Sequence, residues 1–297
     1  MTVVPPASGE PRRPHGPLNP GDAWVVADTG EKYWGRFGAA GLLAYDPARG
    51  VLLQHRVAWS HFGGTWGLPG GALHEGESAL VGAVREAQEE AGVPDRAVLP
   101  RFTSVLDLGL WSYTTVVADV VEPFEPVISD PESVALAWVP LDQVEELPLH
   151  PGFGDSWPLL RPLLEVRPAV VVDAANVVGS VPDGWWKDRA GATGRLRDRL
   201  AGFAAPASDL GLAATTWFPQ VSLVVEGQAR SVADGGEISV IRADAGGDDA
   251  IVEEARRLVS LGREVTVVTS DRGLQSRVEA AGARTLSAGA LLKSIGR

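Results

Sequence analysis

Two patterns of apolar and polar positions divide the chain near residue 167. Before that point, strand-like apolar runs cover residues 38–55, 101–109, 111–121 and 135–144. One amphipathic helical stretch, residues 78–91, lies among them and stops before Gly92 and Pro94, as a C-terminal glycine and a following proline favour. The pattern predicts a mixed α/β sandwich in which a helix packs on a sheet containing antiparallel pairs.

After residue 167, short runs rich in valine and isoleucine alternate with helical runs. The strand-like runs cover residues 169–174, 221–227, 238–245 and 264–271, and the helical runs include 248–262 and 272–283. Near-continuous apolar strands that alternate with helices are typical of a parallel sheet covered on both faces. We therefore expect a second, three-layer α/β domain.

Length and charge agree with two domains. The 297 residues suffice for a disordered Pro-rich tail at 1–20, a first domain at 21–165 and a second domain at 166–297. The whole net charge of −12 lies before Arg167, since acidic and basic residues balance from there onward. The acidic excess argues against broad nucleic-acid binding by the first half, because phosphate contacts need cations. It is compatible with an acidic metal site that faces a small phosphate substrate.

The chain contains no cysteine, which excludes disulfide scaffolds, thiolate zinc sites and cysteine nucleophiles. Its start lacks the apolar core of a signal peptide, and no apolar stretch approaches the roughly 20 residues of a membrane span. These features predict a cytoplasmic protein without a membrane partner. They leave its oligomeric state open.

The helical stretch carries a cluster of glutamates. Glu86, Glu89 and Glu90 stand at positions i, i+3 and i+4, and would share one helix face, while four alanines at 79, 83, 87 and 91 mark another. Like charges at this spacing repel each other. An exposed acidic face is one explanation, and a site for a hard divalent cation such as Mg²⁺, which prefers oxygen ligands, is the other.

The wider spacing favours the metal site. The segment 71–93 matches the pattern G-x5-E-x7-R-E-U-x-E-E-x-G-U through Gly71, Glu77, the Arg85-Glu86 pair, the Glu89-Glu90 pair and Gly92. A small alanine stands where an aliphatic residue is usual. The segment resembles the Nudix box, and the resemblance covers roughly residues 21–164. It implies a Nudix α/β/α sandwich with a mixed sheet, and an enzyme that hydrolyses a phosphoanhydride with Mg²⁺ or Mn²⁺.

The same resemblance assigns roles within and around the box. It implies Glu86, Glu89 and Glu90 as metal ligands, with Glu89 or Glu90 as general base. The resemblance also implies that Arg85 and Glu77 are catalytic residues of the box. Outside the box, Glu132 is our candidate for an additional ligand, against the alternative of an exposed loop glutamate. Candidates for phosphate and substrate contacts are Gly70, Gly71, Trp66 and Tyr113; for the two aromatic residues, ordinary packing is the alternative.

Acidic residues of the second half follow predicted strands. Asp173 and Asp271 stand at strand ends, where open α/β sheets bind their ligands. Asp248 and Asp249 either cap a helix or bind metal. Together with Asn176, these segments resemble the PIN-like NYN domains, a Rossmann-like group of metal-dependent ribonucleases. The resemblance implies metal ligands at Asp173, at Asp248 or Asp249, and at Asp271, with Asn176 beside them.

A segment with two tryptophans and several arginines, residues 182–200, fits contact with single-stranded RNA. Because its arginines alternate with aspartates, a solvated helix with salt bridges explains it equally well.

The sequence thus predicts a metal-dependent hydrolase of a nucleoside diphosphate linked to another moiety, including a nucleoside triphosphate or an oxidised nucleotide. Two alternatives stay open. In one, the second domain is a ribonuclease that the first domain regulates. In the other, the protein senses a nucleotide and binds RNA.

Overall fold

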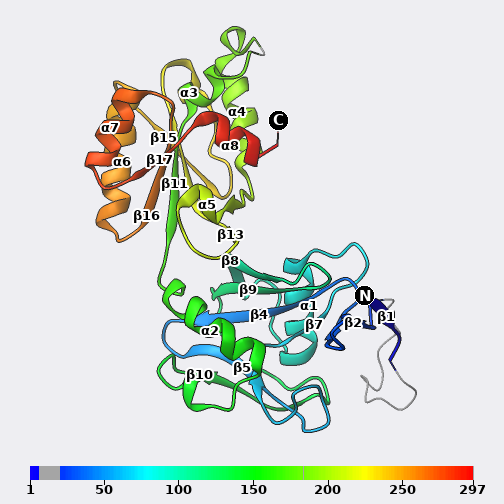
Figure 1. Cartoon of the computed structure of the whole chain (residues 1–297). Coiled ribbons are helices and arrows are strands. Elements are labelled where there is room, and N and C mark those ends of the chain that lie inside the picture. Colours follow the sequence, from blue (N-terminus) through cyan, green and yellow to red (C-terminus); the bar gives the residue numbers. More distant parts are fainter. Residues whose placement is uncertain (7–20, 183, 297) are drawn as a thin grey trace. The chain divides into compact units, whose positions relative to one another are not determined.

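The computed structural model describes residues 1–6, 21–182 and 184–296, and the chain divides into two compact units, Met1–Leu164 and Glu165–Arg297 (Figure 1). Most of the predicted Pro-rich tail falls on residues 7–20, outside the described residues. Its first residues differ from the prediction, because Thr2–Val4 forms a strand that pairs with another strand of the first unit.

The first unit combines strands with two main helices. The strands are β1 (Thr2–Val4), β2 (Trp24–Val26), β3 (Lys32–Trp34), β4 (Ala39–Asp46), β5 (Gly50–Arg56), β6 (Trp66–Gly67), β7 (Gly70–Ala72), β8 (Val98–Asp107), β9 (Ser112–Val120) and β10 (Ser133–Val139). The helices are α1 (Ala79–Ala91), the 3₁₀ turn η1 (Val144–Glu146) and α2 (Pro151–Leu163).

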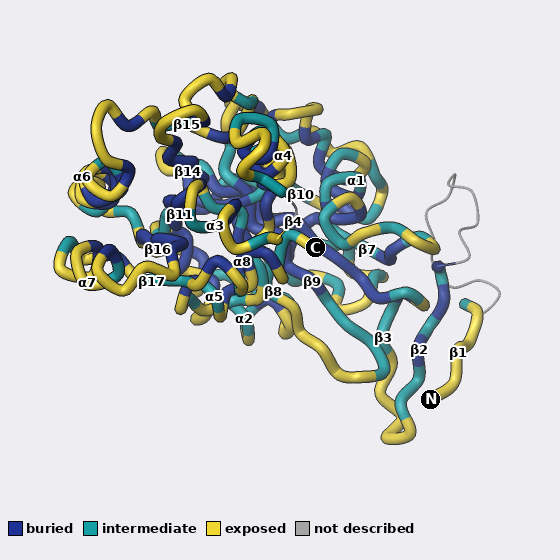
Figure 2. The backbone as a smooth tube through the Cα atoms, turned by 90° about the horizontal axis from the view of Figure 1, so that it is seen from above, coloured by how far each residue is buried: buried dark blue, intermediate teal, exposed yellow. Residues whose placement is uncertain are grey.

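A mixed sheet forms the centre of the first unit. Its strands run in the order β10-β5-β4-β9-β8, with β6 paired to β5 and β7 paired to β4. The β4–β9 pair is parallel and the other pairs of this unit are antiparallel. Helices α1 and α2 lie on opposite faces of the sheet (Figures 1 and 2). This layering confirms the predicted α/β/α sandwich, and a small separate sheet, β1-β2-β3, was not foreseen.

Helix α1 forms as the sequence predicts. The Ser78 hydroxyl accepts a hydrogen bond from the Val81 N–H at its start, and Gly92 ends it in the left-handed conformation. Ala83, Ala87 and Ala91 are fully buried against the apolar side chains of β4 and β9. The small alanine side chains let the helix axis approach the sheet, which brings its glutamates close to the sheet edge.

The second unit alternates strands and helices. The strands are β11 (Pro168–Asp173), β12 (Ala205–Pro206), β13 (Thr216–Trp217), β14 (Gln220–Val225), β15 (Ile238–Arg242), β16 (Glu264–Val268) and β17 (Arg284–Leu286). The helices are α3 (Ala174–Gly179), η2 (Trp185–Lys187), α4 (Arg189–Leu200), α5 (Ala207–Leu210), η3 (Gly227–Ser231), α6 (Gly247–Ser260), α7 (Arg272–Ala280) and α8 (Ala288–Ser294).

Five of these strands build a parallel sheet in the order β15-β14-β11-β16-β17. Helices α6 and α7 pack on one face, while α3, α4 and α8 lie on the other, with buried strands between exposed helix surfaces (Figure 2). The predicted three-layer domain is confirmed. The chain order reverses at β11, and the carboxyl end of that strand is where such sheets bind ligands.

Within the described part of the chain, no helix combines the length and apolar character that crossing a membrane requires.

We expect Gly92→Ala to lower the free energy of unfolding of the first unit by about 1 kcal/mol, because an L-residue with a side chain disfavours left-handed backbone. Gly92 has φ +63°, and an added Cβ would lie 3.2 Å from the Val127 Cβ. Gly154→Ala in α2 is the control: φ is not positive there, and the added Cβ would meet Leu149 at an ordinary 3.5 Å. Equilibrium unfolding in urea measures both, and equal effects would contradict the explanation.

Candidate functional site

The three glutamates of α1 do not share one environment. Glu86 and Glu90 are buried, at 4% and 1% exposure, whereas Glu89 is exposed to solvent. Positions four apart lie one above the other on a helix, so Glu86 and Glu90 both point toward the edge of the sheet at β7. The helix therefore presents two carboxylates to an interior site and a third at its rim.

Arg85 connects the acidic residues of the box. Its guanidinium donates from Nε and Nη2 to the two carboxylate oxygens of Glu77, both at 2.8 Å, and from Nη1 to Glu86 at 2.7 Å. Glu89 lies 3.5 Å from the same Nη1. The Arg85 hydrogen bonds, with a further one from the His74 N–H, lower the pKa of Glu77 to about 2. Glu77 therefore stays ionised near neutral pH and fixes the guanidinium through a two-pronged contact.

Strand β7 brings backbone against the buried carboxylates. The Gly70 N–H donates to Glu90 Oε2 at 2.9 Å. A Cβ at Gly71 would lie 2.7 Å from Glu86 Oε2, so a side chain at this position would force the Glu86 carboxylate to move. Glycine at 71 therefore lets strand β7 pass close to the Glu86 carboxylate without displacing it.

Two carboxylates from outside the box meet Glu90. Ligand oxygens of Glu90, Asp130 and Glu132 all lie within 4.8 Å of one another. The Glu132 N–H donates to Asp130 Oδ1 at 2.5 Å, so both residues belong to one tight turn before β10. The structure thus places Glu132 beside the box. Asp130 was missed, although its position two residues before Glu132 was the signal that could have found it.

The chemistry of this site fits a hard divalent cation. All candidate ligands are carboxylate oxygens, which Mg²⁺ and Mn²⁺ prefer. Two of the glutamates are buried, and burial of ionised carboxylates is costly unless charge or hydrogen bonds compensate it. A side chain at position 71 would displace the Glu86 carboxylate from this arrangement.

Trp66 and Tyr113 differ in their relation to this site. Trp66 stacks on His55, with ring centroids 4.8 Å apart, and exchanges backbone hydrogen bonds with residues 148 and 150. The Tyr113 hydroxyl lies against Gly41, close to where a side chain at that position would be. Burial raises the pKa of Tyr113, the positive charge of Arg56 opposes this effect, and the negative charges of Glu90 and Glu86 add to it. Tyr113 is therefore the aromatic residue that lies near the carboxylates.

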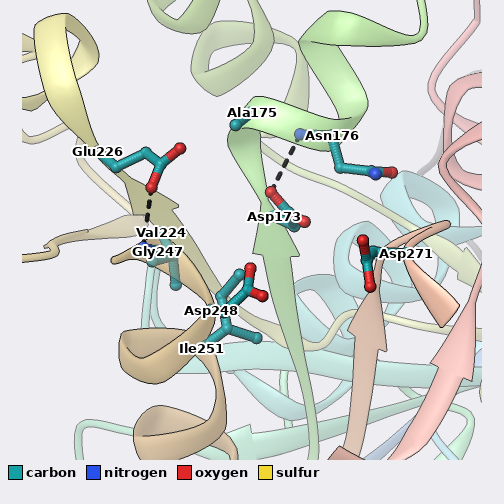
Figure 3. A pocket seen from close by; sticks show the side chains of 9 residues that line it. All are labelled: Asp173, Ala175, Asn176, Val224, Glu226, Gly247, Asp248, Ile251 and Asp271. Atoms are coloured by element: carbon teal, nitrogen blue, oxygen red, sulfur yellow. Dashed lines mark hydrogen bonds between the residues drawn. The ribbon is translucent and has the colours of Figure 1, made fainter. Parts of the chain in front are cut away.

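The second unit has a pocket of about 200 Å³ at the carboxyl end of β11. Figure 3 shows acidic side chains from separate segments of the chain around it. Its lining includes Asp173, Asn176, Glu226, Asp248 and Asp271. These residues come from neighbouring segments at the carboxyl edge of the sheet, as the position of the sheet reversal predicts: Asp173 ends β11, Asn176 lies in α3, Glu226 follows β14, Asp248 lies in the first turn of α6 and Asp271 precedes α7.

Asp173 is the central residue of this pocket. It accepts hydrogen bonds from the Asn176 N–H and the Thr269 hydroxyl, both at 3.0 Å. Burial raises the pKa of Asp173, and the nearby Asp248 and Glu226 charges add to that effect, against the two hydrogen bonds. A carboxylate held in this way is compensated when a cation binds.

The structure separates the two neighbouring aspartates of α6. Both lie near the Arg277 guanidinium, Asp248 at 3.9 Å and Asp249 in a closer ion pair, but only Asp248 is among the residues that line the pocket. Asp271 lines the pocket and caps α7 through the Leu274 N–H at 2.8 Å. Glu226 was missed: it follows β14 directly, as Asp173 ends β11, and accepts the Gly247 N–H at 2.8 Å.

The tryptophan and arginine segment has an exposed ring and an ion pair between neighbouring side chains. Trp186 is 58% exposed, and the Arg189 guanidinium lies 5.2 Å from the Trp185 ring. Arg197 pairs with Asp198, as a solvated helix with salt bridges would have it.

Comparisons with known proteins cover both units. A family model described as the NUDIX domain matches residues 35–160, and one described as the YacP-like NYN domain matches residues 170–297.

Relatives of the first unit are similar in sequence. The putative 8-oxo-dGTP diphosphatase 3 of Mycobacterium tuberculosis is 48% identical over 171 residues, which cover 54% of this chain and 76% of the relative. A nucleoside triphosphate pyrophosphatase/Nudix hydrolase fusion protein of Bifidobacterium longum is 43% identical, over 47% of this chain and 30% of that protein. A crystal structure of a Nudix hydrolase from M. smegmatis is 49% identical, covers 48% of this chain and 95% of its own, and has a TM-score of 0.45.

These matches confirm both family resemblances that the sequence indicates. They also confirm the predicted class of enzyme, a nucleotide pyrophosphohydrolase that acts on acid anhydrides. The chain belongs to the Nudix hydrolase family through its first unit, and its second unit is a YacP-like NYN domain.

Proposed function

We propose that the Nudix domain hydrolyses a phosphoanhydride bond of an oxidised purine nucleoside triphosphate with Mg²⁺ or Mn²⁺. The observation that carries this proposal is the meeting of Glu90 with Asp130 and Glu132 on the helix face that also buries Glu86. The substrate class is supported by the M. tuberculosis relative, which is named for 8-oxo-dGTP and is 48% identical.

In this proposal, the buried and half-buried carboxylates hold the cation. Glu86 and Glu90 supply ligands from α1, and Asp130 and Glu132 supply them from the turn before β10. A divalent cation at such a site neutralises phosphate charge and lowers the pKa of a bound water. The Gly70 N–H keeps Glu90 in place, and glycine at 71 leaves the space beside Glu86 open.

The remaining box residues act around these ligands. Glu89 is the group that we assign as general base, because its side chain is exposed and can pass a proton to solvent, while Glu90 is held by the Gly70 N–H. Arg85 and Glu77 are positioning residues, since the guanidinium bonds to Glu86 and is itself held by Glu77. Tyr113 borders the carboxylates, and Trp66 is a substrate contact only if the substrate extends to the His55 side of the domain.

We expect Glu90→Gln to lower kcat/KM for 8-oxo-dGTP with Mg²⁺ by at least about 100-fold, because the cation loses a ligand that stabilises transition-state charge. Steady-state release of pyrophosphate measures this effect. The control is Glu75→Gln, which changes an exposed glutamate of the loop before α1. Wild-type turnover in Glu90→Gln would remove the proposed metal role of this residue. Comparison with dGTP, ADP-ribose and dinucleoside polyphosphates tests the substrate class separately.

A second candidate function belongs to the NYN domain, which we infer to be a metal-dependent ribonuclease for single-stranded RNA. The observation in favour is the pocket at the sheet reversal, where Asp173, Asp248 and Asp271 converge with Glu226. Several carboxylates around one pocket fit a cation that activates water against a phosphodiester. The exposed Trp186 and the neighbouring Arg189 supply a stacking surface and a phosphate contact for such a substrate.

We expect Asp173→Asn to abolish Mg²⁺-dependent cleavage of a single-stranded RNA while leaving nucleotide hydrolysis by the Nudix domain unchanged. Gel electrophoresis of a labelled RNA measures cleavage. Asp249→Asn is the matched control, because this neighbour of Asp248 pairs with Arg277 outside the pocket lining. Binding of RNA by the wild type without cleavage under any metal condition would favour an RNA-binding sensor instead of a nuclease.

A further inference from the structure

A buried hydrogen bond joins two polar side chains beneath the acidic turn of the Nudix domain. Gln54, on β5, has no exposed surface, and its Nε2 donates to the Ser133 hydroxyl at 2.7 Å. Ser133 opens β10 and is 8% exposed. Among the residues that the structure describes, the other end of the amide, Gln54 Oε1, has no hydrogen-bond partner.

Stability alone does not explain a glutamine at this position. A buried polar atom without a partner costs free energy, whereas an apolar side chain of similar shape carries no such penalty. Gln54 shares its face of β5 with Leu52, a member of the apolar core beneath α1. Gln54 makes one hydrogen bond and leaves its acceptor oxygen unpaired. Its presence is therefore better explained by the position in which that bond holds Ser133.

The bond holds the start of β10, directly after the two acidic residues. Glu132 precedes Ser133 in the chain, its carbonyl oxygen accepts the Val57 N–H at 2.9 Å, and its own N–H binds Asp130. The turn is therefore attached at two points: Ser133 bonds to Gln54 on β5, and Glu132 bonds to Val57 just after β5. The pairing of β10 with β5 shifts register immediately after Ser133, so the regular ladder does not fix the turn on its own.

We propose that Gln54 is a positioning residue of the metal site, which holds Asp130 and Glu132 opposite Glu90 through its bond to Ser133. This inference rests on the proposed metal role of those carboxylates. Gln54 touches no ligand oxygen in the contacts described, and its effect on the cation is carried by the turn. Residues that orient metal ligands in this way typically change metal affinity by 10- to 100-fold when they are replaced.

The test is Gln54→Met, which keeps the length of the side chain and removes the donor. We expect Mn²⁺ to bind about 10-fold more weakly, measured by electron paramagnetic resonance of free Mn²⁺, with a thermal midpoint equal to or above that of the parent. All variants are made in the full chain carrying Asp173→Asn, so that the NYN pocket contributes less to the signal. No nucleotide is needed, so the result does not depend on activity.

Two further variants make the outcome decisive. Ser133→Ala should weaken Mn²⁺ binding as Gln54→Met does, and the double variant should be no weaker than either, because both remove one bond. Val51→Ala changes a buried residue on the opposite face of β5; it should lower the thermal midpoint without changing Mn²⁺ affinity. Parent-like Mn²⁺ affinity in Gln54→Met and Ser133→Ala would overturn the inference.

Glu90→Gln distinguishes failure of the positioning role of Gln54 from failure of the proposed metal site. If it weakens Mn²⁺ binding while Gln54→Met does not, only the positioning role fails. If Glu90→Gln itself binds Mn²⁺ as the parent does, the proposed metal site fails, and the role of Gln54 fails with it.

Discussion

The compensation of two buried carboxylates on one helix is the constraint on which the Nudix domain depends. Glu86 and Glu90 lie one turn apart in α1 with almost no exposed surface. Ionised groups in such places need a positive charge, hydrogen bonds or a metal ion. The Arg85 guanidinium donates a hydrogen bond to Glu86, and the Gly70 N–H donates one to Glu90. The alanine stripe of α1, the glycines of β7 and the bidentate contact of Arg85 with Glu77 all follow from this arrangement.

The NYN domain gathers its carboxylates by a different route. Its acidic residues come from loops and helix starts at one edge of a parallel sheet, not from one helix face. Two of them also serve as helix caps: Asp173 accepts the Asn176 N–H and Asp271 accepts the Leu274 N–H. Asp173 shows that one carboxylate can cap a helix and accept a second donor, since its other oxygen accepts the Thr269 hydroxyl. At Asp248 and Asp249, for which the sequence leaves capping and metal binding open, the structure has no side-chain cap, because Gly246 is the N-cap of α6.

The sequence predicts those features that depend on one continuous segment, but not those that depend on contacts between distant segments. The helix at 78–91, its ends and the close approach of Gly71 follow from spacing and backbone chemistry along one segment. The proximity of Asp130 to Glu90 does not, because it depends on how a loop 40 residues later returns to the helix end. The choice between Asp248 and Asp249 depends on helical phase, since consecutive residues point about 100° apart. Strands β1 to β3 were missed because they are short and lie beside a Pro-rich segment.

The attachment of the segment after Pro126 to the end of α1 has a consequence for the lengths that this loop tolerates. The Val127 N–H donates to the Ala91 carbonyl at 3.0 Å, and the Ser129 N–H lies 3.4 Å from the Glu90 carbonyl, so the unpaired carbonyls of the helix end are capped by the chain that carries Asp130 and Glu132. One inserted residue spans up to about 3.6 Å. A length change between residues 127 and 132 would therefore separate the acidic turn from the helix end that it caps.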